Sequence, residues 1–164
     1  VEEALPPQST KAWGLAAMVA GSVDELALAG SLGARLRLNQ RFSLGLDVEW
    51  NPFLATHGRR FREGIVNLYF TGILRFPLKY ESINLRSSLS FGGSYLLTEL
   101  YGAPEGSIGL FGGISPLGLE VKASKYLYVV INPMSIAIPV PHLTGVPFVY
   151  PQYRFSIGLE FYGG

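Results

Sequence analysis

The chain has 164 residues and a net charge of +1, which gives no electrostatic reason to expect nucleic-acid binding. Charged residues make up 15% of the sequence and hydrophobic residues 48%, so the composition argues against disorder. The sequence has no cysteine, which excludes disulfides, thiolate metal sites and a cysteine nucleophile. Its 20 glycines and 11 prolines are too many interruptions for a helical bundle.

The sequence alternates with a period of two over most of its length. Between residues 42 and 51, every second side chain is large and apolar, and those between are small, polar or charged. This alternation predicts β-strands with one apolar and one polar face. Eight such segments follow in chain order, at residues 11–20, 26–38, 42–51, 65–78, 83–97, 108–122, 126–138 and 152–162.

Two of these segments depart from simple alternation. Residues 22–25 fit a helix capping box, and leucines then recur every four residues, so a helix over 24–38 is an alternative to the strand. Gly30 and Gly33 favour the strand. In the sixth segment the apolar face changes parity across Ser115-Pro116, which predicts a β-bulge or kink there.

The length of the segments favours a membrane environment. Transmembrane strands need roughly 9–11 residues, and the eight segments are long enough. The longest stretch without Asp, Glu, Lys or Arg, residues 126–153, contains five prolines and is therefore not a transmembrane helix. A closed β-barrel is the other structure that satisfies every backbone group within lipid.

The connections between segments alternate in length. Short polar turns at 39–41, 79–82 and 123–125 alternate with a connection at 21–25 and long loops at 52–64, 98–107 and 139–151. In an up-and-down barrel all connections of one kind emerge at the same end, and bacterial outer-membrane barrels have short periplasmic turns. With eight strands, both termini are expected on the short-turn side.

The residues on the polar face indicate which face is inside. This face is rich in Ala, Ser and Gly, which suit the narrow interior of an eight-stranded barrel. A soluble lipocalin-like barrel would instead point its apolar face inward. Aromatic residues near the predicted strand ends are candidates for interfacial girdles: Trp13, Phe42, Trp50, Tyr80, Tyr95, Tyr126, Tyr128, Tyr153 and Phe161.

Charged side chains on the polar face are predicted to form an ion-pair network in the lumen, because buried charges must be paired. A tight turn is expected to bring Arg35 near Asp47 or Glu49. Arg154 and Glu160 are expected to reach the first or the seventh strand. The candidate network comprises Arg35, Arg37, Asp47, Glu49, Arg75, Arg86, Glu120, Lys122, Arg154 and Glu160.

On these features, the chain resembles the small eight-stranded outer-membrane barrels of Gram-negative bacteria, of the OmpA and OmpX kind. Residues 153–161 are similar to the C-terminal signal that the barrel-assembly machinery reads, although Tyr162-Gly163-Gly164 follow it and shift the match. The matching residues are Tyr153, Phe155, Gly158, Leu159 and Phe161.

The resemblance implies insertion in the outer membrane, among its lipids and lipopolysaccharide, with both termini in the periplasm. Residues 1–10 would be a periplasmic N-terminal segment and residues 11–164 a single barrel domain. Roles within this class range from anchoring to adhesion. The barrel-assembly machinery would be a partner during insertion.

Few residues carry candidate chemistry. The two histidines, His57 and His142, fall in predicted outer loops, and we assign neither a catalytic role. They are far apart and have no carboxylate cluster beside them, so no metal site or cofactor is predicted. Arg59, Arg60 and Arg62 form a basic cluster that is a candidate for binding the phosphates of an anionic glycolipid.

The sequence therefore predicts an all-β, eight-stranded antiparallel up-and-down transmembrane β-barrel with a plugged lumen. Its expected role is structural or interactive, as an anchor, an adhesion surface or a subunit of an envelope complex that binds a protein partner through its outer loops. The alternatives are a lipid A-modifying enzyme at the outer leaflet, a small-solute or lipid conduit, and a soluble lipocalin-like carrier.

Overall fold

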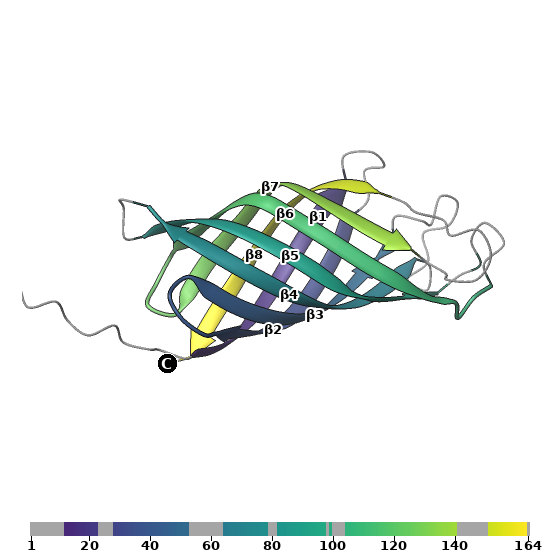
Figure 1. Ribbon diagram of the computed structural model, residues 1–164, viewed down its shortest axis with the longest axis horizontal. Helices are drawn as coiled ribbons and strands as arrows, with labels where there is room; N and C mark the ends of the chain where they lie inside the picture. Colours follow the sequence, from purple (N-terminus) through teal and green to yellow (C-terminus); the bar gives the residue numbers. More distant parts are fainter. Residues whose placement is uncertain are drawn as a thin grey trace, which may run out of the picture.

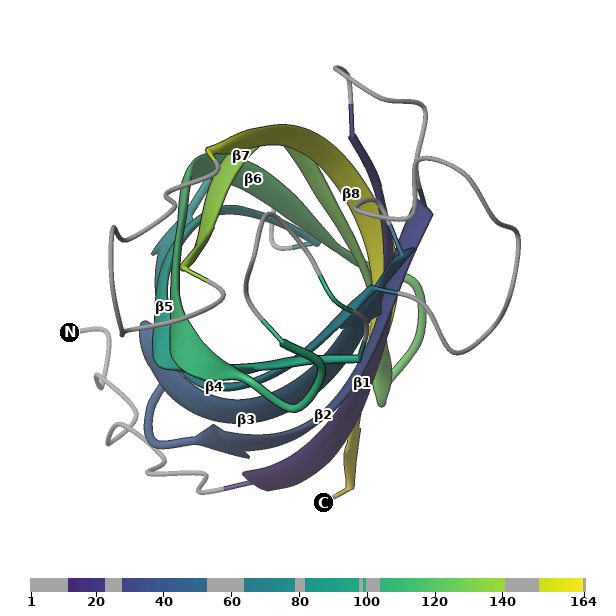
Figure 2. The same cartoon turned by 90° about the vertical axis from the view of Figure 1, so that its right-hand side faces the viewer.

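Eight strands form one closed antiparallel barrel in the computed structural model, which describes residues 12–22, 28–52, 64–78, 82–97, 99, 104–140 and 151–163. Each strand pairs with its neighbour in sequence, and β8 closes the ring against β1 (Figure 1 and, along the barrel, Figure 2). The strands are β1 (Ala12–Ser22), β2 (Leu28–Arg37), β3 (Phe42–Asn51), β4 (Ile65–Pro77), β5 (Ile83–Leu96), β6 (Ile108–Lys122), β7 (Leu127–Val140) and β8 (Gln152–Gly163).

The predicted strand order and antiparallel pairing are confirmed. Residues 28–37 form a strand, so the helix considered for this segment is wrong. The reason is that Leu32 and Leu36 project outward on the same strand face, while Arg35 lies inside. Among the described residues, no helix has the length and apolar character that crossing a bilayer requires.

The apolar face of the barrel is its outer face. Leu44 and Leu46 of β3 are each 43% exposed, whereas Asp47 and Arg35 are each 2% exposed. The same alternation continues along β8, where every second residue is buried. This orientation is opposite to that of a soluble carrier barrel, which places its apolar side chains inside.

Two adjacent strands carry β-bulges. The register of β6 shifts against both of its neighbours at Pro116 and Leu117, which confirms the irregularity predicted at Ser115-Pro116. The register of β7 shifts at Pro133 and Met134. Proline has no N–H to give to the ladder, so a bulge accommodates it.

The two described chain ends lie at one end of the barrel. Trp13 of β1 pairs with Gly163 of β8, and Ala12 pairs with Arg37, which precedes the turn between β2 and β3. The turn between β6 and β7 lies at the same end, on the left in Figure 1. We call this the turn end and the opposite one the far end. The predicted N-terminal segment 1–10 lies outside the described residues.

Candidate functional site: the polar interior of the barrel

The interior near the turn end contains a cluster of three arginines and two glutamates, Arg35, Arg75, Arg86, Glu120 and Glu160, which we call the turn-end cluster. All five side chains are at most 3% exposed. Arg75 Nε lies 2.6 Å from Glu120 Oε2. Glu160 Oε1 accepts Arg35 Nε at 3.1 Å and lies 2.8 Å from Arg86 Nη1. The cluster thus joins five strands across the barrel.

Hydroxyl and aromatic groups surround this cluster. Arg75 Nη2 donates to the Tyr162 hydroxyl at 2.8 Å, and that hydroxyl donates to Glu160 Oε2 at 2.9 Å. The Arg37 guanidinium lies 4.1 Å from the centre of the Tyr162 ring and 4.8 Å from that of Tyr128, which is cation–π geometry. Arginine, glutamate and tyrosine side chains therefore contact one another inside the turn end of the barrel.

Two glycines make room for the ion pair that continues toward the middle of the barrel. Arg35 Nη2 lies 2.8 Å from Asp47 Oδ1, and the Thr71 hydroxyl donates to Asp47 Oδ2 at 2.9 Å. A Cβ at Gly33 would overlap the Asp47 carboxylate, and one at Gly45 would overlap the Arg35 guanidinium. The small residues of the polar face therefore hold open the space that the charged side chains occupy.

A second polar layer, the far-end cluster, consists of Glu49, Asn51, Asn67, Gln152 and Arg154. Arg154 Nη1 donates to Glu49 Oε2 at 2.9 Å, and Asn67 Nδ2 donates to Glu49 Oε1 at 3.0 Å. Arg154 also donates to Gln152, whose Oε1 accepts Asn51 Nδ2 at 3.1 Å. This layer joins the far-end portions of β3, β4 and β8.

An aromatic pair packs inside the barrel next to the far-end cluster. The rings of Tyr69 and Phe111 stack with centroids 4.5 Å apart, and Ala137 completes this buried apolar group. The Tyr69 hydroxyl donates to Glu49 Oε2 at 3.3 Å. A Cβ at Gly92 would overlap the backbone of Leu68 and Tyr69, so glycine is required where β5 passes this ring.

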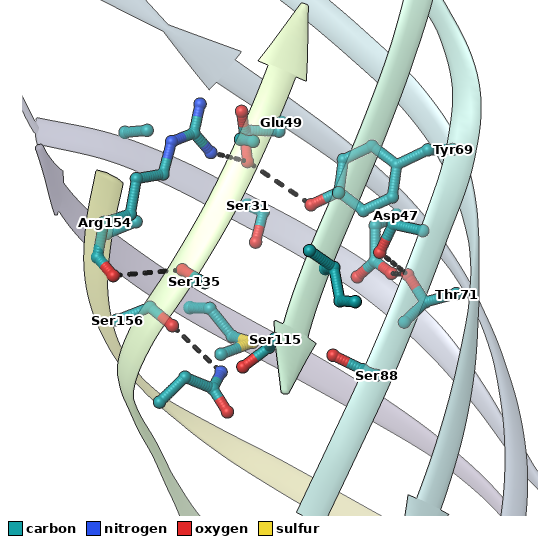
Figure 3. A pocket seen from close by; sticks show the side chains of 18 of the residues that line it. Ser31, Asp47, Glu49, Tyr69, Thr71, Ser88, Ser115, Ser135, Arg154 and Ser156 are labelled. Carbon is teal, nitrogen blue, oxygen red and sulfur yellow. Dashed lines mark hydrogen bonds and ion pairs between the residues drawn. The ribbon is translucent and has the colours of Figure 1, made fainter. Parts of the chain in front are cut away.

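A pocket of about 90 Å³ lies between the two clusters and is bordered by residues of all eight strands. Hydroxyl groups predominate among its polar lining, as the labelled side chains in Figure 3 show. The lining residues with a hydroxyl group are Ser31, Tyr69, Thr71, Ser88, Ser90, Ser115, Ser135 and Ser156.

The structure brings nine of the ten candidate lumen charges into ion pairs, and Lys122 is the exception. Lys122 is exposed at the end of β6, and no ion pair reaches it within the described ranges. Its place in the network was therefore predicted wrongly, because at the barrel rim its ammonium group remains in water. Arg37 lies near the same rim, but its side chain is 16% exposed and lies 3.5 Å from Glu120.

The expected partners of the last strand were also wrong. Arg154 reaches Glu49 of β3, and Glu160 reaches arginines of β2, β4 and β5, whereas β1 and β7 carry no charged residue that could pair with them. The narrow lumen brings strands that are not neighbours within side-chain reach. The sequence analysis did not identify three further inner residues, Tyr69, Gln152 and Tyr162. Each lies two positions from a residue of the polar face (Thr71, Arg154 and Glu160), and strand alternation could therefore have placed it inside.

The remaining candidates lie on the outer surface or outside the described residues. Tyr153, Phe155, Leu159 and Phe161 are each about half exposed on the outer face of β8, and a Cβ at Gly158 on the inner face would overlap the β1 backbone. Trp13 and Tyr95 project outward, but Tyr128 faces the rim of the lumen rather than a girdle, since it stacks edge-on with Tyr162. The candidates outside the described residues are His57, Arg59, Arg60, Arg62, Tyr80 and His142.

The fold is similar to those of known transmembrane barrels. The N-terminal β-barrel domain of Pseudomonas aeruginosa OprF aligns with 95% of this chain and 100% of its own length, at a TM-score of 0.60 and 13% identity. Neisserial surface protein A aligns with 92% of this chain and 94% of its own length, at a TM-score of 0.54 and 13% identity. A structure titled "De novo design of transmembrane beta-barrels" aligns with 96% of this chain and 100% of its own, at a TM-score of 0.58 and 12% identity.

No protein-family model matches the chain, and no curated protein sequence matches it. At identities this low the likeness concerns the fold alone. The fold is the closed eight-stranded antiparallel up-and-down barrel of small transmembrane proteins, which confirms the predicted fold class and the resemblance to small outer-membrane barrels.

Proposed function

We propose that this protein is an outer-membrane β-barrel of a Gram-negative bacterium that serves as an anchor or an interaction surface. The observation that carries the proposal is the orientation of the barrel wall. Leu46 and Phe70 face each other across β3 and β4 and project outward, 43% and 70% exposed, while the charges lie inside. Such an outer face is stable against acyl chains and unstable in water.

The lumen of the proposed barrel is closed by the two polar clusters. The turn-end cluster crosses the interior through Glu160, and the far-end cluster crosses it through the pair Arg154–Glu49. Removing one member of a buried ion pair leaves an unpaired charge in a low-dielectric site, which is costly. This supports a plugged barrel over a conduit.

The proposed orientation places the turn end and both termini in the periplasm, because short turns face the periplasm in barrels of this class. The longer connections then face outward. Arg59, Arg60 and Arg62 belong to one of them in sequence, and we assign them to the phosphates of lipopolysaccharide. A protein partner in an envelope complex would contact the same outer side.

The outer face of β8 is the proposed assembly signal. Tyr153, Phe155, Leu159 and Phe161 present alternating apolar and aromatic side chains outward, and Gly158 fits closely against β1. A strand of this kind presents one continuous apolar face to the assembly machinery before the barrel closes. No observation among the described residues favours the lipid A-modifying enzyme, so we propose a protein without enzymatic activity.

Quenching of tryptophan fluorescence tests the membrane assignment. Trp13 is 70% exposed on the outer face, and a Trp50→Phe variant leaves it as the single tryptophan. After reconstitution into phospholipid vesicles, lipids that carry bromine on their acyl chains should quench its emission more strongly than a water-soluble quencher does. Quenching only by the water-soluble reagent, from a folded protein that remains in solution, would contradict the proposal.

A further inference from the structure

Arg86 differs from the other arginines of the barrel interior in its hydrogen bonding. It is 3% exposed, and its Nη1 lies 2.8 Å from Glu160 Oε1 and 3.7 Å from Glu120 Oε2. Even so, its Nε and Nη1 are buried without a hydrogen bond of acceptable geometry in the described ranges, so the contact with Glu160 is an ion pair that leaves Nε without an acceptor. Arg35, Arg75 and Arg154 each donate at least two hydrogen bonds. A buried guanidinium in this state requires a further acceptor.

The charge balance near Arg86 points to an acceptor that is negative. Four arginines at this end, Arg35, Arg37, Arg75 and Arg86, share three carboxylates among the described residues, those of Asp47, Glu120 and Glu160. Among these described side chains, the arginines therefore outnumber the carboxylates by one. The far-end pair of Arg154 and Glu49 is neutral by itself, so it cannot offset this excess.

Hydroxyl groups next to Arg86 face the pocket between the two clusters. Ser88 follows Arg86 by two residues on the inner face of β5 and pairs with Ser115 of β6. The side chains of Ser88 and Ser115 both point into the pocket (Figure 3). The Ser115 hydroxyl is buried without a hydrogen-bond partner in the described part of the chain. Arg86 also lines the pocket, so a charged donor and two hydroxyls converge on one space.

The two carboxylates that line the same pocket already have partners. Asp47 accepts from Thr71 and pairs with Arg35, and Glu49 accepts from Arg154 and Asn67. Their charges are therefore largely compensated. The pocket of about 90 Å³ exceeds the roughly 10–15 Å³ that one water molecule requires, so it has room for several waters or for one small anion with water.

We propose that the pocket binds one small monovalent anion, such as a halide, beside Arg86, Ser88 and Ser115. The guanidinium supplies charge-assisted hydrogen bonds, which are the stronger kind. The serine hydroxyls complete the shell with neutral donors. The anion offsets the excess of arginines over carboxylates at the turn end and gives the Nε of Arg86 an acceptor.

Anomalous diffraction tests the site directly. The full chain is refolded from urea into detergent in sodium bromide, so that the anion enters before the barrel closes, and is then crystallised. We expect an anomalous bromine peak in the pocket next to Arg86. Its absence, or density that fits ordered water only, would overturn the proposal.

Two variants separate binding at this site from nonspecific salt effects. Arg86→Gln removes the guanidinium, and the peak should disappear. Arg37→Gln also removes one positive charge, but Arg37 does not line the pocket, so the peak should weaken without disappearing. A peak that survives Arg86→Gln at full occupancy would overturn the assignment of Arg86.

Thermal unfolding gives a second readout in solution. At equal ionic strength, bromide at about ten times its dissociation constant should raise the unfolding midpoint by roughly 3–6 °C relative to gluconate. Ser115→Ala keeps every charge and should reduce this difference, so the proposal remains testable if Arg86→Gln does not fold. An equal difference in the wild type and Ser115→Ala would show that Ser115 takes no part. Neither readout depends on membrane location, so failure here is distinct from failure of the proposed function.

Discussion

Arg154 of β8 and Glu49 of β3 lie 2.9 Å apart although 105 residues separate them in the chain. Neither strand is hydrogen-bonded to the other in the barrel. The pair therefore forms across the lumen and exists only once the ring has closed. The Glu160 contacts with Arg35 and Arg86 arise in the same way.

Substitution of a carboxylate of the turn-end cluster should lower the free energy of unfolding. Glu160→Gln leaves Arg35, Arg75 and Arg86 with one counter-charge fewer inside the barrel, and we expect a loss of about 3–5 kcal/mol in the free energy of unfolding. Urea titration in detergent measures it. Lys122→Gln is the control, because Lys122 is exposed and should leave the unfolding midpoint unchanged. Equal effects of the two substitutions would contradict this account of the cluster.

Substitution of glycine by alanine should destabilise the barrel at an inner position and have little effect at an outer one. Gly92→Ala places a Cβ against the backbone of Leu68 and Tyr69, and we expect a loss of about 2 kcal/mol or more. Gly112→Ala is the matched control, since no atom lies within 4 Å of its added Cβ. The unfolding free energies of both variants are compared by urea titration. If Gly112→Ala were the more destabilising, the packing described around Tyr69 would be wrong.

Arginine substitutions on the outer face should show a dependence on depth. Leu46→Arg, in the middle of β3, should destabilise the barrel in phospholipid vesicles by about 2–4 kcal/mol, and Leu78→Arg, just beyond β4, by about 0–1 kcal/mol. The reason is that the charge at mid-height would face hydrocarbon. Equilibrium unfolding in vesicles provides the measurement. Two equal costs would indicate that no apolar slab surrounds the barrel.

The lumen should not conduct ions. The wild-type protein in planar bilayers should give no stepwise current, because both polar clusters cross the interior. The double variant Glu49→Ala/Arg154→Ala removes the far-end pair without leaving an unpaired charge, and it too should remain silent, since the turn-end cluster is intact. Stepwise currents through the wild-type protein would contradict the proposal that the lumen is plugged. Steps in the double variant alone would mean that the far-end cluster is the only barrier.

The sequence predicted the strands and the wall orientation because both depend on local alternation. A period of two assigns each side chain to one of two faces, and the small residues beside Arg35 and Asp47 identified the inner one. Proline lacks an N–H, so the bulge at Ser115-Pro116 was predictable from a single strand. These features require no knowledge of which strands lie opposite each other.

The partners inside the lumen were decided by the tertiary structure alone. Which arginines Glu160 meets depends on the diameter and stagger of the closed ring, which no single strand determines. Tyr69 enters the lumen only because Gly92 on the neighbouring strand leaves room for its ring. Alternation therefore specifies which side chains point inward, whereas closure specifies which of them touch, because contacts across a barrel join residues from distant parts of the chain.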